Sequence, residues 1–191
     1  MNADFTATTF IKKVQAAISE LMGDAALEAA TLNKTINVLF GGLTPSDDSL
    51  LREINYFVAY GTPSTAYLGN GERLGVVNSY KSAFNKLPDT YGEWLDAIKI
   101  ANGRWPSARS ENAESLAKET FKIIYQRIPN MAEEYENAAV TVMAYGLRPK
   151  PRNLNSERAA IKNFMGIFKK IPTSATDWDA VRAIAYSGAK R

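Results

Sequence analysis

The chain has 191 residues, of which 46% are hydrophobic and 23% are charged, and its formal net charge is +3 at pH 7. This composition is that of an ordinary globular protein, and so small a net charge does not by itself favour a nucleic-acid partner. Cysteine and histidine are both absent, which excludes disulfides, thiolate metal sites and every mechanism that needs a histidine base.

The first segment predicts an amphipathic helix over residues 8–22. Apolar side chains recur along one helical stripe from Phe10 to Leu21, and Gly23 follows as a helix stop. The polar start lacks the basic and then apolar pattern of a signal peptide, and no later stretch is long and apolar enough to span a bilayer. We expect residues 1–23 to form a capping helix on the rest of the chain.

One pattern then recurs four times, at a spacing of about 43 residues. Its anchor is an aromatic residue, an aliphatic residue three positions later, and a proline. The four anchors are Phe40-Leu43-Pro45, Phe84-Leu87-Pro88, Tyr125-Ile128-Pro129 and Phe168-Ile171-Pro172. With another large apolar residue four positions before the aromatic, each anchor predicts one continuous helical face that the proline ends.

A second helix is predicted after each proline turn. Six residues after the proline stands a large side chain that we expect to face the first helix, at Leu51, Trp94, Tyr135 and Trp178. Three of these helices begin with the spacing of a capping box. The pairs are Thr90 with Glu93, Asn130 with Glu133, and Ser174 with Asp177.

These elements predict an all-α fold of an N-terminal helix and four helix–proline turn–helix repeats, in a solenoid-like or bundled array. Two motifs also recur at one longer interval: Ala59-Tyr60-Gly61 returns at Ala144-Tyr145-Gly146, and Glu72-Arg73 returns at Glu157-Arg158. This internal duplication predicts one pair of repeats over residues 24–103 and a second over residues 104–191, either as two sub-domains or as one continuous domain.

The connectors that follow the closing glycines carry most of the candidate binding residues. They are Arg104, Trp105, Arg109, Arg148, Lys150 and Arg152. In a regular array these basic residues line one edge, which could hold an anionic polymer such as nucleic acid or an acidic glycan. Alternatively, they complement the negative ends of nearby helices. Trp105 is either an exposed contact for a ligand or partner, or a side chain that folds back over the end of the array.

Two glutamates, Glu72 and Glu157, are the candidates for a glycan hydrolase. Such an enzyme needs two acids in one cleft, about 5–10 Å apart, whereas a whole pair of repeats separates these residues in the sequence. The chain also lacks a phosphate-binding loop and a calcium-binding loop. We therefore expect no catalytic, metal-binding or cofactor-binding residue, and no cofactor.

Several motifs of the chain resemble a known class of segment. They are Gly71-Glu72-Arg73-Leu74-Gly75, Ala144-Tyr145-Gly146-Leu147-Arg148-Pro149, Asn153-Leu154-Asn155-Ser156-Glu157-Arg158 and Asp177-Trp178-Asp179. They are similar to tandem helical repeat segments of uncharacterised envelope or secreted proteins of uncultured bacteria, over residues 45–191. The resemblance implies a location on the cell surface or outside the cell, as part of a longer precursor, and implies no activity.

The sequence therefore predicts a non-catalytic helical repeat module of a larger bacterial surface or secreted protein, acting as a spacer or as a partner-binding scaffold. The expected partner is a protein or a component of the cell envelope. Two alternatives stay open: binding of an anionic polymer through the basic connectors, and hydrolysis of cell-wall glycan.

Overall fold

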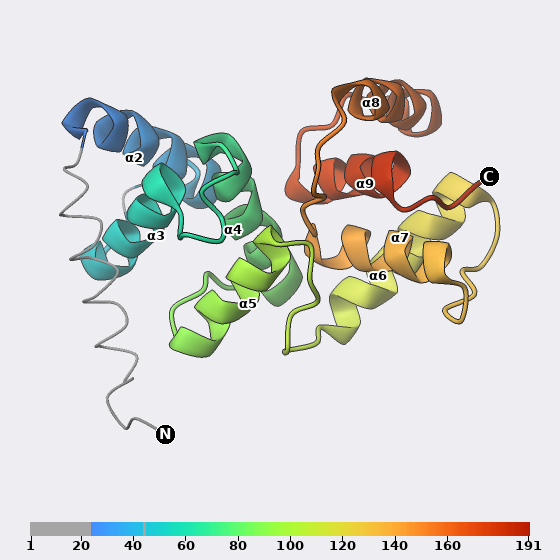
Figure 1. The fold of residues 1–191 in the computed structure, drawn as a ribbon, viewed down its shortest axis with the longest axis horizontal. Coiled ribbons are helices and arrows are strands. Elements are labelled where there is room, and N and C mark those ends of the chain that lie inside the picture. The colour runs from blue at the N-terminus through green and yellow to red at the C-terminus, as the bar shows by residue number, and fades with distance from the viewer. Residues whose placement is uncertain (1–23, 44) are drawn as a thin grey trace. The chain divides into compact units, whose positions relative to one another are not determined.

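A computed structural model describes residues 24–43 and 45–191, and every regular element in these ranges is an α-helix (Figure 1). The helices are α2 (Ala25–Phe40), α3 (Asp48–Tyr60), α4 (Asn70–Phe84), α5 (Tyr91–Ala101), α6 (Glu111–Tyr125), α7 (Glu134–Tyr145), α8 (Leu154–Phe168) and α9 (Ala175–Tyr186). The all-α prediction is confirmed for these ranges. The helix predicted over residues 8–22, with the capping role of residues 1–23, lies outside them.

The chain divides into two compact units, and the division falls within α4 and α5. Residues 1–75 and 89–94 form the first unit, and residues 76–88 and 95–191 form the second. The division predicted at residue 104 stays a prediction. In the first unit α2 packs against α3. In the second, α6 packs against α7, α8 packs against α9, and α7 lies along α9.

Each of the helices α2, α4, α6 and α8 ends at the aromatic residue of its anchor. The residue that follows has a left-handed backbone in all four cases, with φ between 55° and 63°, at Gly41, Asn85, Gln126 and Lys169. A left-handed residue turns the chain away from the helix axis and lets its amide satisfy one of the last carbonyls. Each of these helices therefore ends at the aromatic residue of its anchor, before the proline that was predicted to end it.

The aliphatic residue of the anchor does not extend the helical face, so that part of the prediction is wrong. Leu43, Ile128 and Ile171 are 77%, 77% and 61% exposed, and Leu87 is half-buried. The physical reason is the left-handed residue between the aromatic and the aliphatic position, because it reverses the chain before the aliphatic side chain can reach the buried face.

The large residues that were predicted to face the first helices differ in how far they are buried. Trp94 is buried, and its ring lies 5.3 Å from that of Phe57 in the first unit. Trp178 is 40% exposed, and Tyr135 is exposed as well, so their predicted core positions are wrong. On α9 the buried side includes Asp177, and the next residue is rotated by about 100° around the helix, which turns Trp178 toward solvent.

Candidate functional site

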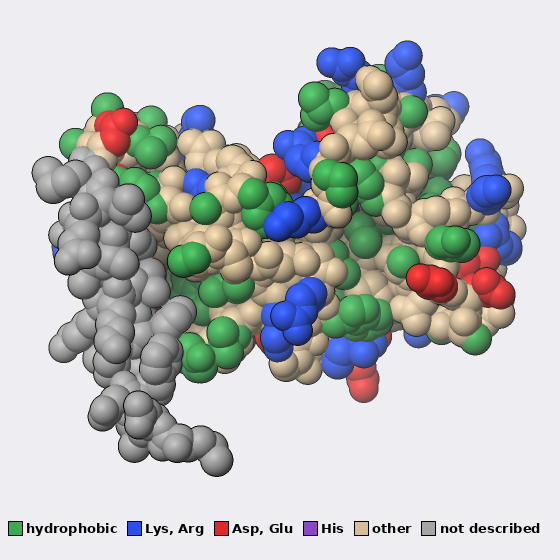
Figure 2. Space-filling model, viewed as in Figure 1, with side chains coloured by type: hydrophobic (Ala, Val, Ile, Leu, Met, Phe, Trp, Pro, Cys, Tyr) green, Lys and Arg blue, Asp and Glu red, His purple; other side chains and the backbone are tan. Residues whose placement is uncertain are grey.

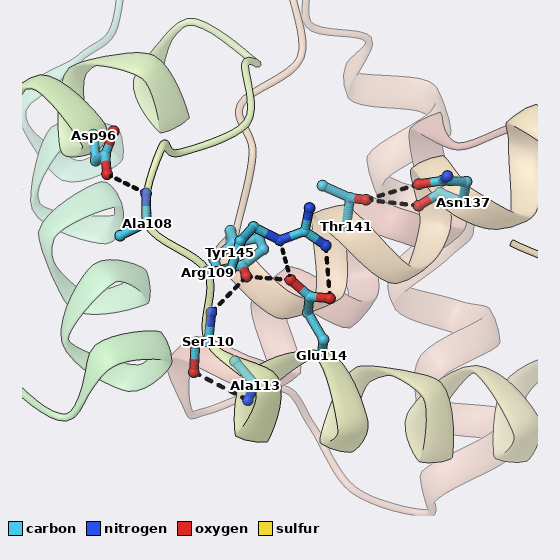
Figure 3. Close-up of polar contacts among 9 residues, drawn as sticks. All are labelled: Asp96, Ala108, Arg109, Ser110, Ala113, Glu114, Asn137, Thr141 and Tyr145. Carbon is cyan, nitrogen blue, oxygen red and sulfur yellow. Dashed lines mark hydrogen bonds and ion pairs between the residues drawn. The ribbon is translucent and has the colours of Figure 1, made fainter.

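A polar contact joins the start of α6 to the end of α7. The hydroxyl of Tyr145, the last residue of α7, donates to Oε1 of Glu114 at 2.5 Å and accepts from the backbone N–H of Ser110 at 2.9 Å (Figure 3). Ser110 is the N-cap of α6, and Glu114 lies in its first turn. One tyrosine thus satisfies an amide and a carboxylate at the same helix start.

The same contact recurs at two other helix pairs, and we call it the cap–Glu–Tyr contact. At α8 and α9, Tyr186 donates to Oε1 of Glu157 at 2.6 Å and accepts from the N–H of Asn153, the N-cap of α8, at 2.9 Å. At α2 and α3, Tyr60 donates to Oε1 of Glu28 at 2.6 Å. Each tyrosine ends its helix, and each glutamate lies in the first turn of its helix.

The remaining pair, α4 and α5, has neither partner of this contact at the matching positions. Arg73 stands where the other pairs have glutamate, and Asn102 stands where they have tyrosine. Arg73 is buried and donates to the carbonyls of Val58 at 2.9 Å, Ala59 at 2.6 Å, and Leu68. It therefore satisfies carbonyls near the end of α3, where the helix dipole favours a cation.

Two of the connector arginines bind the glutamates of the cap–Glu–Tyr contacts. Arg109 donates to both carboxylate oxygens of Glu114, with 2.7 Å between Nη2 and Oε2 (Figure 3). Arg152 does the same to Glu157, at 2.9 Å through Nε and 2.5 Å through Nη2. These arginine hydrogen bonds, with a smaller effect of the tyrosines, lower the pKa of both glutamates. Each arginine charge is thereby matched by an ionised carboxylate.

Arg148 does not line an exposed edge, and this part of the predicted site is wrong. Its side chain is 1% exposed and lies 3.7 Å from Oδ1 of Asp179, which is 2% exposed. Asp179 also accepts from Ser79 at 3.0 Å and from Arg182 at 2.8 Å. The backbone N–H of Arg148 donates to the carbonyl of Ile100 at 3.0 Å, so the connector runs along the end of α5 and its arginine is enclosed.

Trp105 folds back and keeps part of its ring exposed. Its ring centroid lies 6.4 Å from that of Tyr145, and the guanidinium of Arg109 lies 4.4 Å from the indole centroid. This is a cation–π arrangement that covers one face of the indole. Arg104 and Lys150 are exposed. Of the six predicted residues, the structure therefore brings Trp105 and Arg109 together and buries Arg148.

The polar residues that the sequence did not single out are the three tyrosines and Asp179. Tyr60, Tyr145 and Tyr186 recur in the sequence before a closing glycine or serine, and a glutamate recurs in the first turn of α2, α6 and α8. These two recurring positions could have indicated the contact. The pairing of Asp179 with Arg182 is local, three residues along the same helix, but its contacts with Ser79 and Arg148 come from distant parts of the chain and leave no local pattern.

The charge state of Glu157 limits the acid–base chemistry that this side chain can perform. The pKa of Glu157 is held below its ordinary value by Arg152 and then by Tyr186, against the effect of burial, so it stays ionised at neutral pH and is unsuited to donate a proton to a leaving group. Within the part of the chain that the structure describes, no group of acidic side chains could hold a metal ion. None of the described helices combines the length and apolar character needed to cross a bilayer.

Comparison of the chain with protein-family models, with curated proteins and with solved structures finds no match.

Proposed function

We propose that this chain is a non-catalytic helical repeat module that acts as a partner-binding scaffold. The main support for this proposal is that the arginines near the helix ends bind groups within the protein. Arg109 and Arg152 bind first-turn glutamates, Arg148 is buried with Asp179, and Arg73 satisfies backbone carbonyls. These side chains stabilise the fold, as expected for a protein that acts through its surface and not through a reactive centre.

Two recurring features support a repeat array. The cap–Glu–Tyr contact is present in the pairs α2–α3, α6–α7 and α8–α9. Every first helix also ends at an aromatic residue followed by a left-handed one. The packing of α7 along α9 is the kind of contact by which neighbouring repeats bury their apolar faces. The motifs that resemble segments of envelope and secreted proteins support a place at the cell surface.

The two alternatives have less support. An edge that binds an anionic polymer needs exposed cations whose charge is not already matched, but Arg148 is enclosed and Arg109 and Arg152 are bound to carboxylates. A glycan hydrolase needs a carboxylic acid that stays protonated, whereas the pKa of Glu157 is lowered.

Turnover and binding assays on the purified protein distinguish this proposal from both alternatives. We expect no turnover of peptidoglycan fragments, and no binding to heparin or duplex DNA that survives about 0.15 M salt. The proposal would be contradicted by turnover that Glu157→Gln abolishes while far-UV circular dichroism stays unchanged. Polymer binding at that salt which Arg109→Gln and Arg152→Gln weaken would favour the polymer alternative instead.

A further inference from the structure

A groove opens between two helices of the second unit. Helix α7 lies along α9, and each packs against its own first helix, yet α6 and α8 make few contacts with one another. The space left between the end of α6, the side of α8 and the end of α9 is a groove of about 630 Å³. Helices α6 and α8 therefore leave an open space between them at this point.

The walls of the groove are aliphatic and come from three helices. Ile123 from α6, Ile167 from α8 and Ile184 from α9 line it, with the buried Ile124 beneath. Ile123 is 49% exposed. Covering these side chains removes apolar surface from water, which favours an occupant with an apolar face.

A glycine lies on the α8 wall. Gly166 is in the interior of α8, and a Cβ built on it meets no atom within 4 Å. Glycine weakens a helix interior relative to alanine, and packing inside this chain does not demand its small size here. A bare backbone at an open wall does allow another backbone to approach closely.

The charged side chains that line the groove are all positive. Lys162 of α8 and Arg191 line it, and the lining includes no Asp or Glu side chain. Arg127 donates to the carbonyl of Lys190 at 2.7 Å, which positions the segment that carries Arg191. Two cations beside aliphatic walls complement a partner with acidic side chains flanking an apolar stripe. On the face seen in Figure 2, Lys and Arg side chains gather around α8, and apolar surface lies between α8 and α9.

We propose that this groove binds an acidic amphipathic helix of a partner protein. The apolar stripe of that helix packs on Ile123, Ile167 and Ile184, while its glutamate or aspartate side chains face Lys162 and Arg191. A helix is the element that presents an apolar stripe flanked by acidic side chains on one face. This inference rests on the proposed function as a partner-binding scaffold, and it names the site and the class of partner.

The test uses the whole chain and two synthetic peptides. One is a fluorescein-labelled helical peptide of about 20 residues, with leucine on one stripe and glutamate elsewhere, and the other has lysine in place of every glutamate. Fluorescence anisotropy measures binding to the wild type and to two variants of α6. Ile123→Asp places a charge in the groove, and Leu116→Asp is its matched control, because Leu116 is 59% exposed on the same helix and does not line the groove.

We expect the acidic peptide to bind the wild type and the lysine peptide not to bind. Ile123→Asp should weaken binding by roughly tenfold or more, as loss of a central apolar contact does, and Leu116→Asp should leave it unchanged. Gly166→Leu, which fills the open wall, should weaken binding as well. Circular dichroism of each variant verifies that its helices are retained.

Three results would overturn the inference: no binding of the acidic peptide at low salt, equal binding of the lysine peptide, or equal affinity of the Ile123→Asp and Leu116→Asp variants. Each of these removes this groove as the site while partner binding elsewhere on the chain stands. The proposed function itself fails by a different observation, which is catalytic turnover that depends on Glu157.

Discussion

Replacing Tyr145 by phenylalanine removes one hydroxyl from the cap–Glu–Tyr contact and leaves the ring in place. The side chain is fully buried, and its hydroxyl bonds Glu114 and the N–H of Ser110. Burial, and then the neighbouring glutamate, raise the pKa of Tyr145, so the hydroxyl is a neutral donor at pH 7. The substitution therefore isolates two hydrogen bonds from the packing of the ring.

The magnitude follows from the two bonds. A hydrogen bond to a charged group contributes about 1.5–3 kcal/mol and a neutral one about 0.5–1.5 kcal/mol. Glu114 keeps Arg109 as a partner and its side chain is 19% exposed, so water replaces part of what is lost. We expect Tyr145→Phe to lower the free energy of unfolding by about 2 kcal/mol.

Urea denaturation followed by far-UV circular dichroism measures this loss. A double-mutant cycle with Glu114→Gln should give a coupling energy of about 1–2 kcal/mol, because the two side chains bond one another. The control cycle combines Tyr145→Phe with Glu157→Gln, whose side chains belong to different contacts, and should be additive. A loss below about 0.5 kcal/mol, or equal coupling in both cycles, would refute an architectural role for the contact.

Four further substitutions test the packing and the charges. Burial raises the pKa of Asp177, but hydrogen bonds from Lys170 and nearby amides outweigh it and lower the pKa from 3.8 to about 2. Asp177→Asn should therefore lower the free energy of unfolding by about 2 kcal/mol at pH 7. Urea titrations should show this difference shrinking as the pH falls from about 4 to 2. Trp94→Ala should lower the unfolding free energy by about 3–5 kcal/mol, and Trp178→Ala by clearly less because its ring is partly exposed; urea midpoints compare them. Gly166→Ala should raise the thermal midpoint, with a gain of about 0.5–1 kcal/mol, because its Cβ meets open space.

Only part of the helix boundaries was predictable from local capping chemistry. The capping box predicted at Ser174 and Asp177 is present, because each side chain accepts a hydrogen bond from the backbone N–H of the other residue. The one predicted at Asn130 and Glu133 is wrong: α7 begins at Glu134 with no side-chain cap from Glu133, and Glu136 accepts from the N–H of Asn130 at 2.6 Å instead. Spacing alone cannot tell which of several nearby acids in a turn reaches an amide.

The left-handed residues that follow the first helices were not predictable from residue type. Gly41 suits that backbone, but Gln126 and Lys169 adopt it as well, and side-chain-bearing residues do so infrequently. Without them, the aliphatic residues of the anchors looked like part of the helical face. The structure places them outside it.

The candidate site was only partly visible in the sequence. Arg109 lies one residue before the N-cap of α6 and Glu114 lies in its first turn, so their pairing is local and could have been inferred. The burial of Arg148 could not, because it depends on Asp179 from α9. A charged residue in a connector predicts a surface position, whereas the structure buries Arg148 beside Asp179.

We propose that the second unit of this chain binds another protein. Photo-crosslinking in the cells that make it is the most direct test, with a benzophenone amino acid placed in turn at the exposed apolar positions Leu116, Ile123, Ile128 and Met165. We expect a light-dependent adduct with one discrete protein from at least one of these positions. Absence of an adduct from all four, in cells where the protein is folded and abundant, would contradict it.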